Sequence, residues 1–125
     1  MKPIRIDFAK PEEFRYQEIG NYGDYGSDEN GTWFRILETG NPIYNLAILV
    51  HELYEKVVKD RDGVPDPVVD DWDLMHPEDD DPGMLDGCPY REQHMDATLL
   101  ERMVLSLAGE KWKDYEEALA SFYKE

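Results

Sequence analysis

The stretch Ile48-Leu49-Val50-His51-Glu52-Leu53-Tyr54-Glu55-Lys56-Val57-Val58 decides the fold, because it reads as an apolar helix with a His-Glu-x-x-Glu pattern at its centre. The run Gly40-Asn41-Pro42 before it supplies a breaker, a capping residue and a proline for the first helical position. Gly63 and Pro65 follow the stretch and are typical of a helix end. The sequence therefore predicts a central helix over residues 41–63.

One apolar stripe runs along this predicted helix, and His51 lies at its edge. At about 100° per residue, the stripe consists of Leu46, Val50, Leu53, Tyr54 and Val57. Glu55 lies one turn after His51 and projects beside it, whereas Glu52 points further round. An edge position is half in the core and half open to water, so His51 and Glu55 are predicted to line a cleft.

The composition predicts one folded, acidic domain over residues 1–125. The chain has 29 Asp and Glu against 13 Lys and Arg, which gives a formal net charge of -16. This charge disfavours direct binding to nucleic acid and favours a bound cation or a basic partner. No segment approaches the roughly 18 apolar residues of a membrane span. Because the N-terminus also lacks a hydrophobic signal region, a cytoplasmic location is expected. The single cysteine, Cys88, excludes an internal disulfide and a cysteine-based zinc cluster.

The N-terminal third, residues 1–40, is predicted to form a small antiparallel sheet. Its strand-like segments are Ile4–Phe8, Phe14–Ile19 and Thr32–Glu38. The last of them follows a tight-hairpin signal at Asn30-Gly31. The glycine-rich run Gly20–Gly26 is predicted to be a flexible turn, with a mobile flap over a site as the alternative.

Residues 64–125 are predicted to be helical apart from an acidic loop over residues 77–89. The expected helices are Asp66–Met75, Arg91–Leu107 and Glu110–Tyr123. Their number and order give the predicted fold class, α+β, with a small antiparallel sheet followed by about four helices. The second of these helices has two stripes, a core stripe of Ala97, Leu100, Val104 and Leu107 and a polar one of His94, Thr98 and Glu101.

The polar residues of the two longest helices suggest a metal site. His51 and Glu55 are spaced i, i+4, so they project toward one point, as metal ligands on a helix commonly do. His94 is the predicted third ligand. Glu101 is either a fourth ligand or the acceptor that fixes the tautomer of a ligating histidine. Glu52 remains free to act as a general base that deprotonates a water molecule held by the metal.

The metal and the alternatives to it follow from the same residues. Two imidazole ligands favour Zn²⁺, with Mn²⁺ or Fe²⁺ as alternatives, and Asp73 and His76 are reserve ligands. Without a metal, His51 would be a histidine at the edge of the core that hydrogen-bonds Glu55. Glu52 would then be a solvated charge. The His-Glu-x-x-Glu pattern would have arisen by chance, since glutamate is a favoured helix former.

The segment His51-Glu52-Leu53-Tyr54-Glu55, on a helix after a small sheet, resembles the active-site helix of the zincin metallopeptidases, which carry His-Glu-x-x-His. This resemblance implies a zincin-like outline, with His51 as a zinc ligand and Glu52 as the general base. Glu55 departs from the pattern, because it stands where the second histidine belongs. With the later segment Pro89-Tyr90-Arg91-Glu92-Gln93-His94, the chain also resembles a group of small uncharacterised phage and prophage proteins, a resemblance that implies no known activity.

These features favour a metal-dependent hydrolase-like protein in which activated water attacks an amide or ester of an unknown substrate. The alternative is a non-enzymatic acidic interaction protein, such as a phage-encoded nucleic-acid mimic or inhibitor that covers a basic surface of a host protein. Its function would depend on the acidic residues Asp66, Asp70, Asp71, Glu78, Asp79, Asp80, Asp81 and Asp86. A third hypothesis is a former hydrolase that keeps the metal for structure.

Overall fold

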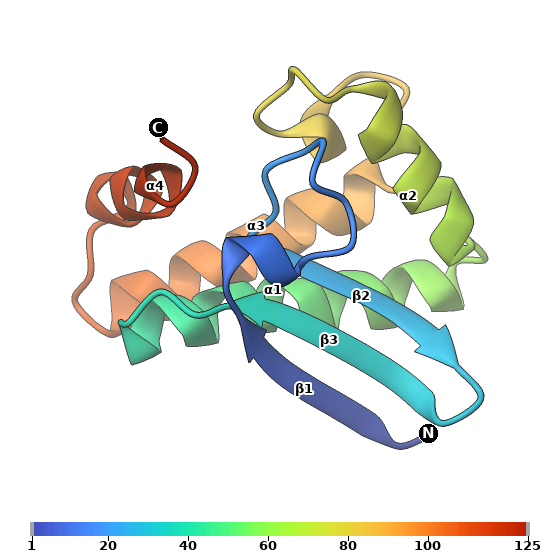
Figure 1. Cartoon of the computed structure of the whole chain (residues 1–125), viewed down its shortest axis with the longest axis horizontal. Coiled ribbons are helices and arrows are strands. Elements are labelled where there is room, and N and C mark those ends of the chain that lie inside the picture. The colour runs from blue at the N-terminus through green and yellow to red at the C-terminus, as the bar shows by residue number, and fades with distance from the viewer. Residues whose placement is uncertain (1, 125) are drawn as a thin grey trace.

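A small N-terminal sheet is followed along the chain by four helices (Figure 1). The computed structural model describes residues 2–124. The strands are β1 Ile4–Ala9, β2 Gly23–Asp28 and β3 Gly31–Leu37. The helices are α1 Pro42–Arg61, α2 Asp66–Met75, α3 Arg91–Leu107 and α4 Trp112–Ser121. Two short 3-10 turns, η1 Pro11–Glu13 and η2 Pro82–Met84, interrupt the connections. This arrangement confirms the α+β class and the four helices.

The sheet is mixed, whereas the sequence predicted an antiparallel one. Its strand order is β1-β3-β2, with β3 antiparallel to β2 and parallel to β1. The connection over residues 10–22 reverses the chain once, and the hairpin at Asn30-Gly31 reverses it again. Two reversals make β3 run in the direction of β1, and because β3 lies between the other strands, the β1–β3 pair is parallel. The hairpin itself is confirmed, with Gly31 at φ 126°.

The second strand lies in the glycine-rich run and not at Phe14–Ile19, so both of those predictions are wrong. Phe14–Ile19 belongs to the connection between η1 and β2, where Phe14 is buried. Gly26 allows β2 to pair with β3, because a Cβ at this position would lie 2.5 Å from the indole ring of Trp33. Small residues in this strand therefore reflect close packing across the sheet.

Helix α1 has the predicted bounds but buries a different face. Its N-cap is Asn41, whose side chain accepts hydrogen bonds from the backbone N–H groups of Ile43 and Tyr44. In the predicted stripe, Leu46 is 45% exposed and Val57 is 43% exposed. The buried residues are instead Ala47, Ile48, His51, Glu55, Lys56 and Lys59. Because α1 is apolar around most of its surface, the packing of α3 and the sheet selects which side becomes the core.

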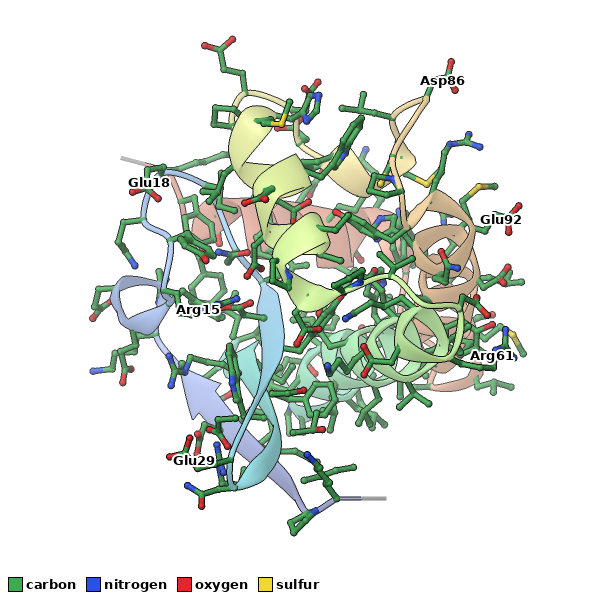
Figure 2. All side chains as sticks on the ribbon, turned by 90° about the vertical axis from the view of Figure 1, so that its right-hand side faces the viewer. Arg15, Glu18, Glu29, Arg61, Asp86 and Glu92 are labelled. Atoms are coloured by element: carbon green, nitrogen blue, oxygen red, sulfur yellow. The ribbon has the colours of Figure 1, made fainter. Side chains whose placement is uncertain are left out.

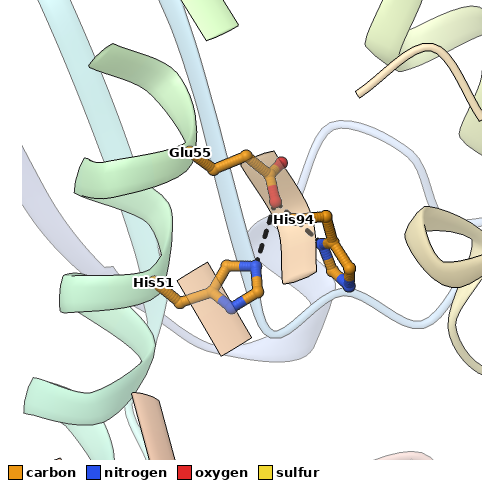
Figure 3. Close-up of side chains that lie close together, drawn as sticks. All are labelled: His51, Glu55 and His94. Carbon is orange, nitrogen blue, oxygen red and sulfur yellow. Dashed lines mark hydrogen bonds and ion pairs between the residues drawn. The ribbon is translucent and has the colours of Figure 1, made fainter. Parts of the chain in front are cut away.

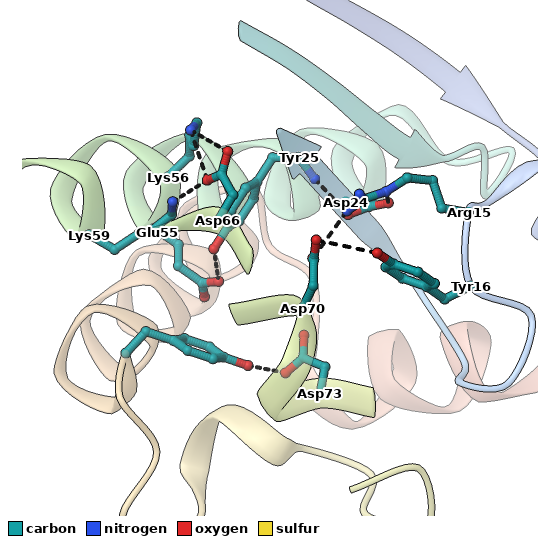
Figure 4. A network of polar contacts seen from close by, with 11 residues as sticks. Arg15, Tyr16, Asp24, Tyr25, Glu55, Lys56, Lys59, Asp66, Asp70 and Asp73 are labelled. Atoms are coloured by element: carbon teal, nitrogen blue, oxygen red, sulfur yellow. Dashed lines mark hydrogen bonds and ion pairs between the residues drawn. The ribbon is translucent and has the colours of Figure 1, made fainter. Parts of the chain in front are cut away.

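Two lysines of α1 are buried beside one carboxylate. Lys59 is fully buried and Lys56 is 3% exposed. Both ammonium groups contact Asp66 at the start of α2, Lys56 at a distance of 2.9 Å (Figure 4). Lys59 also contacts Asp60 at 2.7 Å. Asp66, which follows the N-cap Pro65, therefore joins α2 to α1 by ion pairs with buried lysines.

For the remaining helices, the predicted bounds agree with the structure better than the predicted core residues do. Helices α2 and α3 have the predicted bounds, whereas α4 is shorter at both ends than the predicted Glu110–Tyr123. On α3, Ala97 and Leu105 are buried, but Leu107, from the predicted core stripe, is 86% exposed. The acidic loop over residues 77–89 connects α2 to α3 and contains η2.

Charged side chains are spread over the outside of the molecule, as Glu18, Asp86 and Glu92 illustrate in Figure 2. The excess of acids gives this surface its negative charge. Among the helices formed by residues 2–124, none has the length and apolar character required to cross a membrane.

Candidate metal centre

Helices α1 and α3 bring His51, Glu55 and His94 together (Figure 3). His51 and Glu55 lie one turn apart on α1, and His94 projects toward them from the beginning of α3. His51 is 8% exposed and Glu55 is 4% exposed, so the group lies at the edge of the core. One nitrogen of each histidine and one oxygen of Glu55 lie within 4.8 Å of one another. The structure thus places three of the four predicted ligands at one point.

Both imidazoles contact the same carboxylate oxygen. Oε2 of Glu55 lies 3.0 Å from Nε2 of His51 and 2.8 Å from Nδ1 of His94. The two rings are 4.8 Å apart between centroids and inclined at 70°. Two histidines and one glutamate are the protein ligands of one class of catalytic zinc sites, so the donor set fits this metal.

The outer atom of each of these side chains is also held by a hydrogen bond. These contacts are His51 Nδ1 to Glu101 (2.8 Å), His94 Nε2 to Asp81 (2.7 Å) and Glu55 Oε1 to the hydroxyl of Tyr25 (2.7 Å, Figure 4). A carboxylate on the outer nitrogen fixes the tautomer and orientation of a ligating histidine. Because both outer nitrogens have one, each imidazole in its neutral form would direct the lone pair of its inner nitrogen toward a metal ion.

Without a metal, protons hold the cluster together. Burial alone would lower the pKa of His51, but its hydrogen bonds to Glu101 and Glu55 raise that pKa well above its ordinary value. Burial opposes a charge on His94 in the same way, and its contacts with Asp81 and Glu55 raise the pKa to about 9. Burial favours the neutral form of Glu55, yet both imidazolium groups keep its pKa well below the usual range. The metal-free cluster is therefore two imidazolium ions around one carboxylate.

Glu52 lies beside the cluster and is not part of it. Burial raises the pKa of Glu52 to about 8; the imidazole of His51 opposes this shift and the carboxylate of Glu55 adds to it. The side chain packs against β2, where a Cβ at Gly23 would lie 2.5 Å from Cγ of Glu52. Glu52 is thus a half-buried residue next to the candidate ligands, and its carboxylate binds a proton more strongly than that of an ordinary glutamate.

Two pockets meet at the cluster. The acidic pocket has a volume of about 130 Å³, and its lining includes Asp70, Asp73, Asp79 and Asp80. The aromatic groove has a volume of about 580 Å³, and its lining includes Tyr22, Trp112 and Tyr115. His51, Glu52 and His94 line both. Glu55 lines the acidic pocket alone, so all three residues of the cluster border that pocket.

The other predicted ligands lie near the group without joining it. Glu101 contacts the outer nitrogen of His51, which is the place of the tautomer-fixing acceptor and not of a fourth ligand. Asp73 and His76 line the acidic pocket. The Nδ1–H group of His76 donates to the backbone oxygen of Trp72 at 2.8 Å, so this nitrogen is already used.

Sequence reasoning missed two residues that support the site, Asp81 and Tyr25. Asp81 is one of four consecutive acids, and nothing in that run singles out the member that faces His94. Tyr25 lies in the glycine-rich run, where the strand that points it toward Glu55 was not predicted. The pairing of β2 with β3 is the missing information in the second case.

We expect Gly83→Ala to weaken metal binding by about tenfold or more, because orientation of a ligand is worth about that much. A Cβ at Gly83 would lie 2.5 Å from Cγ of His94, so the imidazole must move. Competition with a zinc chelator measures the affinity. Gly20→Ala is the matched control, since a Cβ there meets Tyr123 at an ordinary 3.6 Å. Equal affinities in the two variants would show that the position of His94 is unimportant for the metal.

Comparisons with protein-family models, with curated proteins and with solved structures found no match to this chain. The resemblances to zincins and to small phage proteins therefore remain predictions from the residues that carry them, and the functional argument depends on the geometry of the site.

Proposed function

We propose that the protein is a metal-dependent hydrolase that binds zinc through His51, Glu55 and His94, with Mn²⁺ or Fe²⁺ as alternative metals. The observation that supports this most directly is that each proposed ligand has one atom in the cluster and a second atom held by a hydrogen bond. The inner atoms converge within 4.8 Å, while each outer atom hydrogen-bonds a separate partner. The outer contacts would fix the orientation of the three side chains, so that their inner atoms could face a single metal ion.

Glu52 has the position and proton affinity of a general base in such an enzyme. It lines both pockets beside the ligands, and its pKa of about 8 makes its ionised form a stronger base than an ordinary carboxylate. A zinc ion, when bound, supplies Lewis acidity and lowers the pKa of a coordinated water molecule to about 7. Glu52 would take the proton from the attacking water and return it to the leaving group of an amide or ester.

The donor set also accounts for the departure from the zincin pattern. In the proposed site the glutamate ligand is Glu55 on the motif helix, and the second histidine, His94, comes from α3. Two histidines and a glutamate are retained as a set, although their order along the chain differs from His-Glu-x-x-His. This exchange supports metal binding despite the imperfect motif.

The test is the metal content of protein purified without a histidine tag or chelator. We expect a near-stoichiometric amount of zinc, manganese or iron by elemental analysis, and loss of that metal in His51→Ala and His94→Ala. The variant Glu52→Gln should retain the metal and lose hydrolytic activity in a screen of esters and amides. His76→Ala is the matched control, because His76 lines the same acidic pocket outside the ligand group.

Two results separate this proposal from its rivals. Absence of metal, together with no thermal shift on addition of any of the three ions, would contradict the hydrolase. Bound metal without hydrolysis, and equal behaviour of Glu52→Gln and the parent, would indicate that the metal serves structure alone.

A second candidate function is supported by the exposure of the acidic loop. Glu78, Asp79, Asp80 and Asp86 are exposed, as a mimic of nucleic acid or an inhibitor of a basic host protein requires. Asp66 and Asp70 do not contribute in this way, because they pair with Lys56 and Arg15 respectively. A complex of this kind should weaken steeply with salt and should survive His51→Ala.

A further inference from the structure

Strand β1 leaves one edge of the sheet open, and its backbone shows which residues face outward. The carbonyl groups of Pro3 and Ala9 accept hydrogen bonds from Thr32 and Glu38 of the β3 side at 2.9 and 2.8 Å. Backbone groups alternate in direction along a strand, so the odd-numbered residues face β3. The even-numbered residues Ile4, Ile6 and Phe8 carry the N–H and C=O groups of the open edge.

The side chains of the same three residues form an apolar row. Ile4, Ile6 and Phe8 are 40%, 41% and 50% exposed. Ile6 and Phe8 are paired in register with Phe34 and Ile36, which are buried. Paired residues share a face of the sheet. The row therefore lies on the same face as the buried residues Phe34 and Ile36, but it remains exposed. An open edge with an apolar row on it is a template for pairing with another strand.

The charges of β1 select one register for pairing with a second copy. In an antiparallel pair about a twofold axis, outward-facing residues must oppose outward-facing residues, so even numbers pair with even numbers. Centring the axis on Ile6 pairs Ile4 with Phe8 and sets Arg5 opposite Asp7, twice. Shifting it to Arg5 would oppose two arginines, and shifting it to Asp7 would oppose two aspartates, both destabilising arrangements.

We propose that two copies of this chain associate through antiparallel β1 strands centred on Ile6, forming a continuous six-stranded sheet. Within β1 the interface is self-complementary in hydrogen bonding, in apolar contact and in charge, as an isologous dimer requires. Arg5 already contacts Asp28 of its own chain, but a guanidinium has donors for two carboxylates. Residues 4–9 line neither the acidic pocket nor the aromatic groove, so the dimer leaves the candidate metal centre open.

Cysteine cross-linking tests the register. In a full-length Cys88→Ala background, Ile6→Cys sets two thiols opposite each other, with Cβ atoms about 5 Å apart. A short thiol-specific cross-linker should convert this variant to a covalent dimer. Ile4→Cys and Phe8→Cys are matched controls: each thiol lies about 13 Å from its own symmetry mate at roughly 3.3 Å per residue. Efficient cross-linking of either control and not of Ile6→Cys would overturn the proposal.

Charge exchange tests the contacts independently of cross-linking. Sedimentation velocity should give a dimer for the parent protein. For Arg5→Asp and for Asp7→Arg the dissociation constant of the dimer should be at least about tenfold higher. The double variant restores both pairs and should restore the dimer. Ile6→Lys should give monomer, whereas Met75→Lys, at an apolar site of α2 that is still more exposed, should not. A parent protein that stays monomeric up to about 100 µM, or a dimer that Ile6→Lys leaves intact, would overturn it.

Discussion

Glu55→Gln is expected to abolish zinc binding and to destabilise the metal-free protein. A neutral amide in place of the carboxylate removes one ligand, and we expect the affinity to fall by more than about a hundredfold. In the metal-free state the same carboxylate accepts hydrogen bonds from both imidazolium groups and from Tyr25. Its loss leaves two buried positive charges facing each other, which costs about 3 kcal/mol or more of unfolding free energy.

Chelator competition and denaturant unfolding at pH 7 measure these two effects on one preparation. Glu92→Gln is the matched control, because Glu92 is an exposed acid of α3 and the substitution is chemically identical. We expect this control to keep both properties within about 0.5 kcal/mol. If Glu55→Gln unfolds like the control and binds zinc equally well, the carboxylate at the centre of the cluster serves neither role.

The helices were predictable because their signals are local. Asn41 and Pro42 define where α1 begins, and prolines lie next to the start of α2 and of α3, although neither helix has a side-chain cap. The buried face was not predictable, since α1 has apolar residues on most sides and the position of α3 decides which of them are covered. Leu46 and Val57 were assigned to the core for this reason and are exposed. The order of the strands was not predictable for a similar reason, because the route of the connection over residues 10–22 decides that β3, and not β2, pairs with β1.

At the candidate site, the spacing of His51 and Glu55 predicted their contact within α1. His94 on α3 was predicted because imidazole is a common metal ligand. The i, i+4 spacing of His51 and Glu55 is a property of any helix. His94 was identified as a polar residue on a largely apolar helix, and the packing of α3 on α1 brings it to the other two. Asp81 comes from an irregular loop, where no periodicity relates sequence to direction. Local rules therefore identify the ligands, and tertiary structure identifies what supports them.

The affinity for zinc is expected to rise steeply with pH, approaching a hundredfold per pH unit between about pH 6 and 8. In the metal-free cluster the inner nitrogens of His51 and His94 carry protons, because their pKa values are well above the ordinary value and about 9 respectively. Zinc must displace both protons. Below both pKa values each displaced proton costs a factor of about ten in affinity per pH unit.

The stability of the metal-free protein should change in the opposite direction over the same range. The pKa of His94 is about 9 in the folded protein and about 6.5 in an unfolded chain. A raised pKa contributes stability that is complete below pH 6.5 and is lost as the pH rises through 9, on the order of 3 kcal/mol for one histidine. Raising the pH should therefore weaken the metal-free fold and strengthen metal binding together.

Calorimetric titration with zinc in buffers of different ionisation enthalpy counts the protons released, and denaturant unfolding with and without a chelator follows the two stabilities. About two protons should be released per zinc at pH 7. Zinc that binds with no proton release, or an affinity that is flat from pH 6 to 8, would place the metal away from His51 and His94. Under the proposal the protons and the metal compete for the same nitrogens, so one set of residues should account for both curves. The unfolding free energy that the protein loses above pH 7 in the presence of a chelator should be regained when zinc is bound.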